Sequence, residues 1–384
     1  MNIKETDKKY IMGTYGRVDL ELEYGVGATL YDSAGKSYID FGSGIAVNTF
    51  GAADREWIEA VTAQLAKIQH TSNYYYTKPC ADLAEALCKK TAMSKVFFSN
   101  SGAEANECAI KAARKYGTDK NPDKNIIITL KNSFHGRTVT TLSATGQETF
   151  HKHFTPFTQG FSYVEANNTD ELTVAMNDNV CAIMMELIQG EGGVLPITDE
   201  FASAAAELAK KFDALLIIDE VQTGNGRTGK LYAHQHFGLK PDIFTTAKGL
   251  GGGLPIGATV FSEKLADILP AGSHGSTFGG NPISCAGALN ILNRIDDKLL
   301  KEVLGKSKKI ISELENLDGV ENITGMGLML GIKTKKDAKE VMKACLDKGL
   351  LVLTAKDKVR LLPPLNISNQ ELCAGLEILK SVIE

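Results

Sequence analysis

Short, largely apolar runs alternate with amphipathic stretches through the first two thirds of the chain. Apolar residues recur at spacings of three and four in 105–116 and in 201–212, which predicts helices with one buried face. Runs of four to six largely apolar residues, typical of buried strands, cover 96–99, 126–130, 182–187, 214–218, 243–247 and 258–261. Buried strands that alternate with helices predict an α/β fold with a mostly parallel central sheet covered on both faces.

The pattern changes after residue 279. Helical stretches rich in Lys and Glu alternate there with short apolar runs such as 327–332 and 350–353. We therefore expect three parts: an N-terminal segment (1–50) that packs with a small domain, a large domain (51–279), and a smaller C-terminal α+β domain (280–384).

The charge balance narrows the range of partners. The 384 residues have a net charge of −4, from 42 basic and 46 acidic side chains spread without long blocks. This balance argues against nucleic acid or a membrane surface as a partner. Seven cysteines without a CxxC motif predict reduced thiols. A polar N-terminus, and no run of about 18 apolar residues, predict a cytoplasmic protein that does not enter a membrane.

Several polar side chains follow the predicted strands or lie close after them. They are Ser101, Arg137, Glu191, Asp219 and Lys248. In parallel sheets, ligands bind beyond the carboxyl ends of the strands. The sequence therefore predicts a functional site at this edge of the sheet.

Asp219 and Lys248 each allow two interpretations from the residues alone. A carboxylate at the end of a buried strand needs a positive partner, which a protonated pyridine nitrogen or an arginine would provide. A desolvated lysine amine has a lowered pKa and becomes nucleophilic, but the glycines after Lys248 also suit a solvated turn.

Ser101 begins a predicted helix. The spacing of Ser101 and Glu104 fits a capping box. The free N–H groups of the first turn, including Gly102 and Ala103, suit a phosphate, although most capped helices bind no anion.

A glycine-rich loop at 224–230 (GNGRTGK) fits two nucleotide-binding patterns, GxGxxG and GxxxxGK. GxxxxGK requires Ser or Thr at the next position, where Leu231 stands. GxGxxG should follow its strand directly and open a helix. A nucleotide-binding protein is therefore the weaker hypothesis from another functional class. No HExxH or paired CxxC motif indicates a metal. The pairs His151/His153 and His234/His236 are expected in surface loops.

Seven segments in order resemble the class III (ornithine-type) aminotransferases, which have the pyridoxal-phosphate (PLP) fold type I. They are SGAEAN from Ser101, FHGRT from Phe134, QGEGG from Gln189, DEVQTGNGRTGK from Asp219, AKGLGGGLPIGA from Ala247, HGSTFGGNP from His274 and RLLPPL from Arg360. The resemblance implies PLP as the cofactor and a large domain joined to a smaller α+β domain.

The resemblance also implies roles for individual residues. Lys248 would carry the cofactor as a Schiff base and transfer the proton, Asp219 would pair with the ring nitrogen, and Gln222 would reach the ring hydroxyl. Phe134 and Val221 would flank the ring. The implied cofactor contacts are Ser101, Gly102, Ala103, Phe134, Asp219, Glu220, Val221, Gln222, Lys248 and Thr277. Thr277 would come from a second subunit, which implies a homodimer with shared active sites.

Two arginines would recognise substrate. Arg137 is similar to the family's α-carboxylate ligand, and Arg360 with Glu191 resembles its switch pair, masked for an amine donor and opened for 2-oxoglutarate. Glu191 would thereby join Lys248 and Asp219 in catalysis. For both arginines the alternative is a structural ion pair. Tyr15 and Ser276 would line the same pocket.

Within the family, SGIAVN (43–48) and TYGR (14–17) resemble the N-acetylornithine subgroup. That resemblance implies transfer of the δ-amino group of N2-acetylornithine to 2-oxoglutarate, giving N-acetylglutamate 5-semialdehyde and glutamate, as in arginine biosynthesis. Free ornithine, succinylornithine, succinyl-diaminopimelate and 4-aminobutyrate remain alternative donors. Leu187 stands where many family members have proline.

Overall fold

The computed structural model describes residues 2–384 and is built around a seven-stranded sheet. In spatial order its strands are β4 (Lys95–Ser99), β12 (Gly257–Phe261), β11 (Ile243–Thr246), β10 (Leu215–Asp219), β7 (Val180–Met185), β5 (Ile126–Leu130) and β6 (Phe161–Val164). The predicted strands are confirmed within two residues at each end, whereas β6 was not predicted. The fold class is confirmed as α/β with a mostly parallel sheet.

One strand, β12, runs antiparallel to both of its neighbours, β11 and β4. The connection from β11 to β12 is a glycine-rich turn of about ten residues. A parallel crossover needs a dozen or more residues, usually including a helix. The short turn therefore reverses the chain and lies at the end of the sheet where the site forms.

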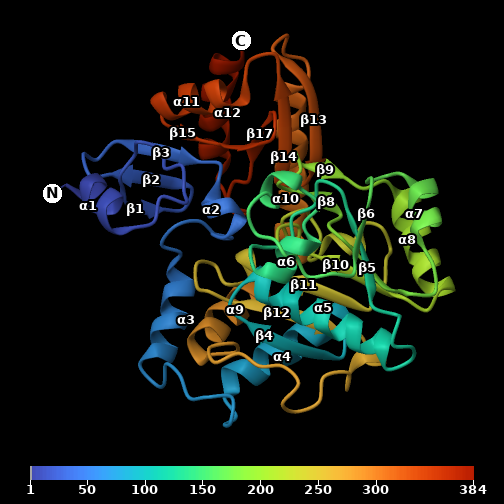
Figure 1. The fold of residues 1–384 in the computed structure, drawn as a ribbon. Coiled ribbons are helices and arrows are strands. Elements are labelled where there is room, and N and C mark those ends of the chain that lie inside the picture. The colour runs from blue at the N-terminus through green and yellow to red at the C-terminus, as the bar shows by residue number, and fades with distance from the viewer. Residues whose placement is uncertain (1) are drawn as a thin grey trace.

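Helices cover the sheet on both faces because strand side chains alternate (Figure 1). On β10, Leu215 and Ile217 pack in one buried cluster with α5 (Gly102–Thr118). Leu216 and Ile218 pack in the other cluster, together with Phe201 of α8 (Asp199–Lys211). The predicted helices at 105–116 and 201–212 are confirmed, each with its apolar stripe against the sheet.

Two smaller sheets flank the central one. The first joins β1 (Leu22–Val26), β2 (Thr29–Asp32) and β3 (Ser37–Asp40) to β15 (Leu350–Leu351); the second joins β13 (Val320–Met326), β14 (Met329–Thr334), β17 (Lys358–Leu361) and β16 (Leu353–Ala355). Because β15 pairs in parallel with β3, the N-terminal strands share a sheet with the C-terminal part. Figure 1 shows these blue and red segments together above the central sheet. This supports the predicted packing of residues 1–50, while the three-part division stays a prediction.

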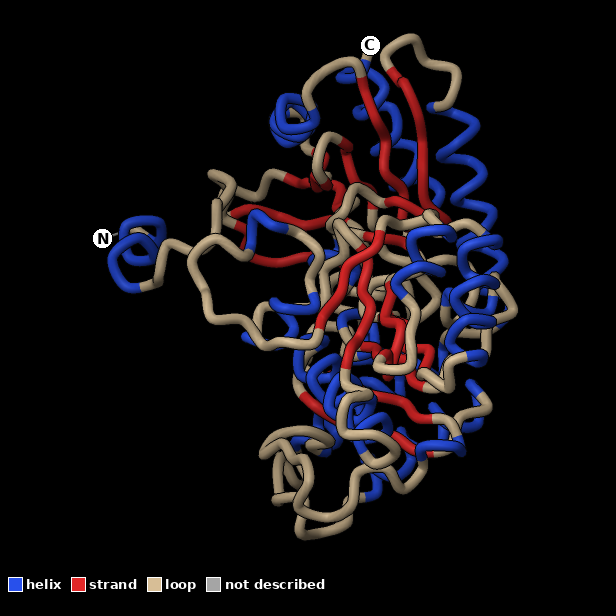
Figure 2. Tube along the Cα trace, turned by 45° about the vertical axis from the view of Figure 1, so that its right-hand side comes forward, coloured by secondary structure: helices blue, strands red, loops and turns tan. Residues whose placement is uncertain are grey.

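The remaining elements complete the layers around the sheets. The helices are α1 (Ile3–Tyr10), α2 (Ser43–Ala46), α3 (Arg55–Leu65), α4 (Lys78–Thr91), α6 (Val139–Ala144), α7 (Thr169–Ala175), α9 (Pro282–Arg294), α10 (Asp297–Leu314), α11 (Ala338–Asp347) and α12 (Asn369–Ile383). The short elements are β8 (Ile188–Gln189), β9 (Leu195–Pro196), η1 (Glu148–Phe150), η2 (Ala233–Gln235), η3 (Lys248–Leu250) and η4 (Glu263–Leu265). Figures 1 and 2 both show α1 at the outer edge of the molecule. Over residues 2–384, none of these helices has the length and apolar character needed to span a bilayer.

Candidate active site

A cavity of about 410 Å³ lies at the carboxyl ends of the central strands. Loops after β4, β5, β7, β10 and β11 form most of its wall. Ten of the predicted site residues line it: Ser101, Gly102, Ala103, Phe134, Arg137, Glu191, Asp219, Val221, Gln222 and Lys248. They come from loops spread over about 150 positions of the chain, and the sheet edge brings them together.

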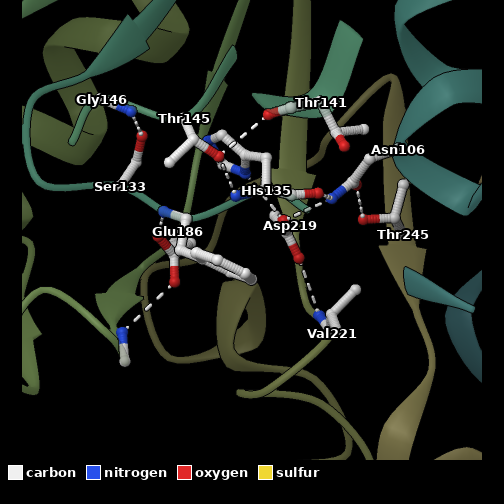
Figure 3. A network of polar contacts seen from close by, with 12 residues as sticks. Asn106, Ser133, His135, Thr141, Thr145, Gly146, Glu186, Asp219, Val221 and Thr245 are labelled. Carbon is white, nitrogen blue, oxygen red and sulfur yellow. Dashed lines mark hydrogen bonds and ion pairs between the residues drawn. The ribbon is translucent and has the colours of Figure 1, made fainter. Parts of the chain in front are cut away.

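Asp219 ends β10 and is 4% exposed. Figure 3 shows its carboxylate among Asn106, His135 and Val221. Oδ2 accepts hydrogen bonds from Asn106 Nδ2 (2.8 Å) and His135 Nδ1 (2.8 Å), and Oδ1 accepts one from the Val221 N–H (3.0 Å). These donors hold a buried carboxylate in one orientation at the cavity wall.

His135 is a buried hydrogen-bond partner of Asp219, and its pKa depends on that carboxylate. Burial alone would lower the pKa of His135, but the hydrogen bond and charge of Asp219, with a smaller effect of Glu186, raise that pKa above its ordinary value. The other ring nitrogen, Nε2, is buried without a hydrogen-bond partner within residues 2–384. Within residues 2–384, the His135 ring therefore forms a side-chain hydrogen bond only through Nδ1, to Asp219.

Lys248 follows β11 and opens η3 with a positive φ of 43°. Burial lowers the pKa of its amine, and the nearby Arg360 lowers it further, although Glu191 and Asp219 act in the opposite direction. Lys248 lines the cavity and is only partly exposed, which favours the desolvated amine over a solvated turn. A desolvated amine with a lowered pKa lies beside a buried carboxylate, which suits nucleophilic and proton-transfer chemistry.

The N-terminus of α5 faces the same cavity. Ser101 is the N-cap, and its Oγ accepts from the Glu104 N–H (3.2 Å). The Glu104 carboxylate accepts from the Asn100 N–H (2.7 Å) and from Ser101 Oγ (3.3 Å) rather than from the Ser101 N–H, so only half of the predicted capping box forms. The N–H groups of Gly102 and Ala103 have no intrahelical partner, as in any first turn. They are available to an anion in the cavity.

Arg360 and Glu191 form a partly buried ion pair. Arg360, 3% exposed on β17, places Nη1 2.6 Å from Glu191 Oε1 and 3.3 Å from Gln222 Oε1. Burial of Glu191 would raise the pKa of its carboxyl, but the charge and hydrogen bond of Arg360 hold that pKa below its ordinary value. The pair connects the C-terminal sheet to the cavity wall.

Arg137 has a different environment. Its guanidinium lies 4.0 Å from the ring centroid of Phe150 and 5.3 Å from that of Phe134. Within residues 2–384, no carboxylate forms an ion pair with it, so the structural-ion-pair alternative is wrong for this arginine. An exposed guanidinium held over aromatic rings remains available to a carboxylate ligand.

The other predicted residues lie outside the cavity wall. Ser276 Oγ accepts a hydrogen bond from Asn100 Nδ2 (3.0 Å), and Asn100 lines the cavity. Thr277 is exposed on the neighbouring loop. Tyr15 is 72% exposed and lies in the N-terminal segment, beneath Arg17 at 5.7 Å.

Glu220 turns away from the cavity, and its prediction as a cofactor contact is not supported by its side-chain contacts. The carboxylate accepts from the N–H groups of Ala233 (3.0 Å) and His234 (2.8 Å) and lies 3.0 Å from His234 Nδ1. A fully buried charge needs such donors. His234 is buried in this contact, so its predicted place in a surface loop is wrong.

Sequence reasoning missed several residues that line the site, among them the polar side chains of Asn106, His135 and Glu186. His135 lay inside the FHGRT segment, and Glu186 stands at the end of an apolar run, as Asp219 does. Glu186 accepts hydrogen bonds from the N–H groups of Phe134 (2.8 Å) and Gly190 (3.2 Å). Burial raises the pKa of this carboxyl to about 7.

The glycine-rich loop at 224–230 joins the two main parts of the chain. Its Arg227 is buried and donates through Nη1 to the carbonyl oxygens of Leu328 (3.1 Å) and Pro363 (2.5 Å). A short η2 follows only at Ala233, so no helix N-terminus meets the loop. The nucleotide-binding hypothesis is not supported.

Comparisons with known proteins agree with this geometry. The chain is 50% identical to an acetylornithine aminotransferase of Haemophilus ducreyi, over 99% of this chain and 98% of that one. An N-acetylornithine aminotransferase structure from Stenotrophomonas maltophilia has a TM-score of 0.86 at 36% identity, covering 99% and 98% of the two chains. An ornithine aminotransferase structure from Toxoplasma gondii has a TM-score of 0.94 at 30% identity, covering 99% and 93%. The family model for Aminotransferase class-III matches residues 13–383, and the chain belongs to the class III aminotransferases.

Proposed function

We propose that this aminotransferase moves the δ-amino group of N2-acetylornithine to 2-oxoglutarate, giving N-acetylglutamate 5-semialdehyde and glutamate. The observation that carries the proposal is one cavity containing a desolvated amine (Lys248), a buried carboxylate (Asp219) and a guanidinium (Arg137) that has no ion pair within residues 2–384. The substrate choice rests on full-length relatives that carry the acetylornithine name, at 50% and 46% identity.

Class III aminotransferases use PLP, and the chemistry of the cavity fits this cofactor. When bound, PLP supplies the electron sink for negative charge that develops on the substrate carbon. An amine, a buried carboxylate, an aromatic face and a helix N-terminus complement its aldehyde, ring nitrogen, ring and phosphate. Lys248 would hold the aldehyde carbon and Asp219 the ring nitrogen. Phe134 and Val221 would flank the ring.

The remaining cofactor contacts are part of the same proposal. Gln222 would reach the ring hydroxyl, and the N–H groups of Gly102 and Ala103, opened by the Ser101 cap, would bind the phosphate. Gly102 approaches Val221 so closely that an added Cβ would lie 2.7 Å from Val221 Cγ1. That contact supports a fixed spacing between the phosphate site and one face of the ring.

Proton transfer falls to Lys248. The lowered pKa of its amine suits this role: Nζ would accept a proton from the substrate carbon and deliver it to the aldehyde carbon of the cofactor. The protein's other contribution is placement, because a C–H bond held perpendicular to the cofactor ring is the bond that breaks. Arg137 would hold the α-carboxylate and so orient the substrate beside Lys248.

The Glu191–Arg360 pair would distinguish the two substrates. While paired, Glu191 neutralises Arg360, and an amine donor meets no free cation there. 2-Oxoglutarate brings a second carboxylate, which would compete with Glu191 for the guanidinium. A dicarboxylate and an acylated amine could thus use one cavity in turn.

A homodimer with shared active sites belongs to the proposal. Thr277 is exposed beside Phe278, which is 61% exposed, and the neighbouring Tyr74–Tyr76 side chains are exposed as well. Exposed aromatic groups near an active site favour an interface. A second subunit would bring Thr277 to the partner's phosphate site and cover Tyr15 and Ser276. The cytoplasmic location expected from the sequence stays a prediction.

The test is a panel of amine donors mixed with PLP-loaded protein, followed by the loss of visible cofactor absorbance. We expect N2-acetylornithine to react far faster than ornithine, succinylornithine, succinyl-diaminopimelate or 4-aminobutyrate. If free ornithine reacts fastest, the aminotransferase chemistry remains and the substrate assignment is wrong. That outcome would agree with the similarity to the Toxoplasma gondii ornithine enzyme.

A further inference from the structure

We propose that Glu186 is a positioning residue that ties the Phe134 segment, the Gly190–Glu191 turn and the His135–Asp219 pair into one unit at the cofactor site. The inference rests on one part of the proposed function, the binding of PLP in this cavity. It does not depend on which amine donor the enzyme uses.

The hydrogen bonds of Glu186 point in two directions. Oε1 accepts from the Phe134 N–H at 2.8 Å, and Oε2 accepts from the Gly190 N–H at 3.2 Å. Phe134 is the predicted ring-flanking residue, and Gly190 precedes Glu191, which meets Arg360. One side chain at the end of β7 therefore fixes two loops that approach the cavity from different strands (Figure 3).

The backbone after Glu186 leaves little room for other arrangements. A Cβ added to Gly190 would lie 2.4 Å from Gln222 Oε1, so the turn packs directly against the residue proposed to reach the ring hydroxyl. Without the Glu186 hydrogen bond, the Gly190 N–H would lose its only observed partner in residues 2–384. A buried N–H without a partner is destabilising, which favours a shift of the turn.

Charge gives Glu186 a second connection. The charged groups that face it are His135, Asp219 and Lys248. Burial raises the pKa of Glu186 to about 7; His135 opposes this rise, and Asp219 adds to it. Glu186 in turn raises the pKa of His135. Removing the charge of Glu186 should therefore weaken the protonation of the imidazole that holds Asp219.

The direction of the pH effect follows from these shifts. The pKa of Glu186 is raised from an ordinary value of 4.5 to about 7, so the folded state favours its protonated form. The stability that the raised pKa of Glu186 contributes is fully present below pH 4.5 and is lost as the pH rises through about 7. The raised pKa of His135 acts in the same direction, since its contribution is also lost with rising pH. Replacing Glu186 by Gln should remove much of this pH dependence.

The experiment compares Glu186→Ala and Glu186→Gln with wild type in two measurements that need no amino donor. Equilibrium dialysis gives the Kd for PLP, and thermal unfolding of the PLP-free protein at pH 5.5 and pH 8 gives the Tm. We expect Ala to raise the Kd about tenfold or more, and Gln, which keeps one acceptor of two, about threefold. The Tm advantage of wild type over the Gln variant should shrink from pH 5.5 to pH 8.

Glu207→Ala is the matched control, because Glu207 is exposed on α8. It should leave both measurements unchanged. If Glu186→Ala lowers the Tm but leaves the PLP Kd at the wild-type value, the residue is only structural and the proposal is wrong. An equal Tm difference at both pH values would also contradict it. Failure of wild type to bind PLP would instead overturn the proposed function.

Discussion

The floor and the rim of the cavity are built differently. The floor consists of Asp219, His135, Asn106, Glu186 and Lys248: it is largely buried, and its carboxylates have hydrogen-bond donors from this chain. The rim consists of Arg137, which is exposed, and of the loop just outside the wall that carries Ser276 and the exposed Thr277. The geometry of the floor is thus determined within one chain, and changes there should affect every substrate. Changes at the rim should affect substrates selectively.

The largest effect is expected at Lys248. Lys248→Ala removes the nucleophile and the proton carrier together, and we expect turnover to fall by about 10⁴-fold. Steady-state kinetics with N2-acetylornithine and 2-oxoglutarate measure this loss. The control is Lys230→Ala, an exposed lysine of the glycine-rich loop, which should keep normal turnover. Near-normal turnover in the Lys248 variant would break the contrast between floor and rim.

Asp219→Asn should give the next largest effect. It leaves His135 facing an uncharged amide and removes the counter-charge for the ring nitrogen, which in a buried site costs about 3–5 kcal/mol, or roughly 10²- to 5 × 10³-fold in PLP affinity and turnover. The loss should be equal for all amine donors. Unchanged PLP affinity, measured by dialysis, would remove Asp219 from the cofactor site.

The contrast between floor and rim also explains what the sequence could predict. Apolar runs revealed the sheet because fully buried strands contain few polar residues, and Asp219 and Lys248 were notable as charges at the ends of such runs. The antiparallel direction of β12 was not predicted, although only ten residues separate the predicted strands 243–247 and 258–261, too few for a parallel crossover. The N-terminal sheet was less visible, because its β1 is mostly exposed and carries no apolar run.

Errors at the site have two physical causes. Asp219 and Glu220 are neighbours at a strand end, and successive side chains of a strand point to opposite faces. Sequence alone does not say which of two adjacent carboxylates enters the cavity. Asp219 does, and Glu220 binds the backbone around His234. His135 and Glu186 were missed because their importance comes from partners distant in the sequence, Asp219 and Gly190 among them.

Arg137→Lys should give a smaller and more selective effect. Lysine keeps the charge but loses the planar, bidentate grip on a carboxylate, worth roughly 10- to 100-fold in kcat/KM. N2-acetylornithine and glutamate should both be affected, since both carry an α-carboxylate, while the Kd for PLP stays at its wild-type value. A large change in PLP affinity would place Arg137 with the floor instead.

Phe150 offers the finest test of the rim. Its ring lies 4.0 Å from the Arg137 guanidinium carbon and 5.9 Å from the Phe134 ring, edge to face, so it helps aim an arginine that forms no ion pair in the described part of the chain. Phe150→Leu keeps an apolar side chain but removes the aromatic face; a cation–π contact of about 0.5–1 kcal/mol predicts a two- to fivefold rise in KM for the amine donor. Phe150→Tyr keeps the ring face and should restore the wild-type KM. If Leu and Tyr behave alike, packing rather than the aromatic face positions Arg137, and the rim is more rigid than its exposure indicates.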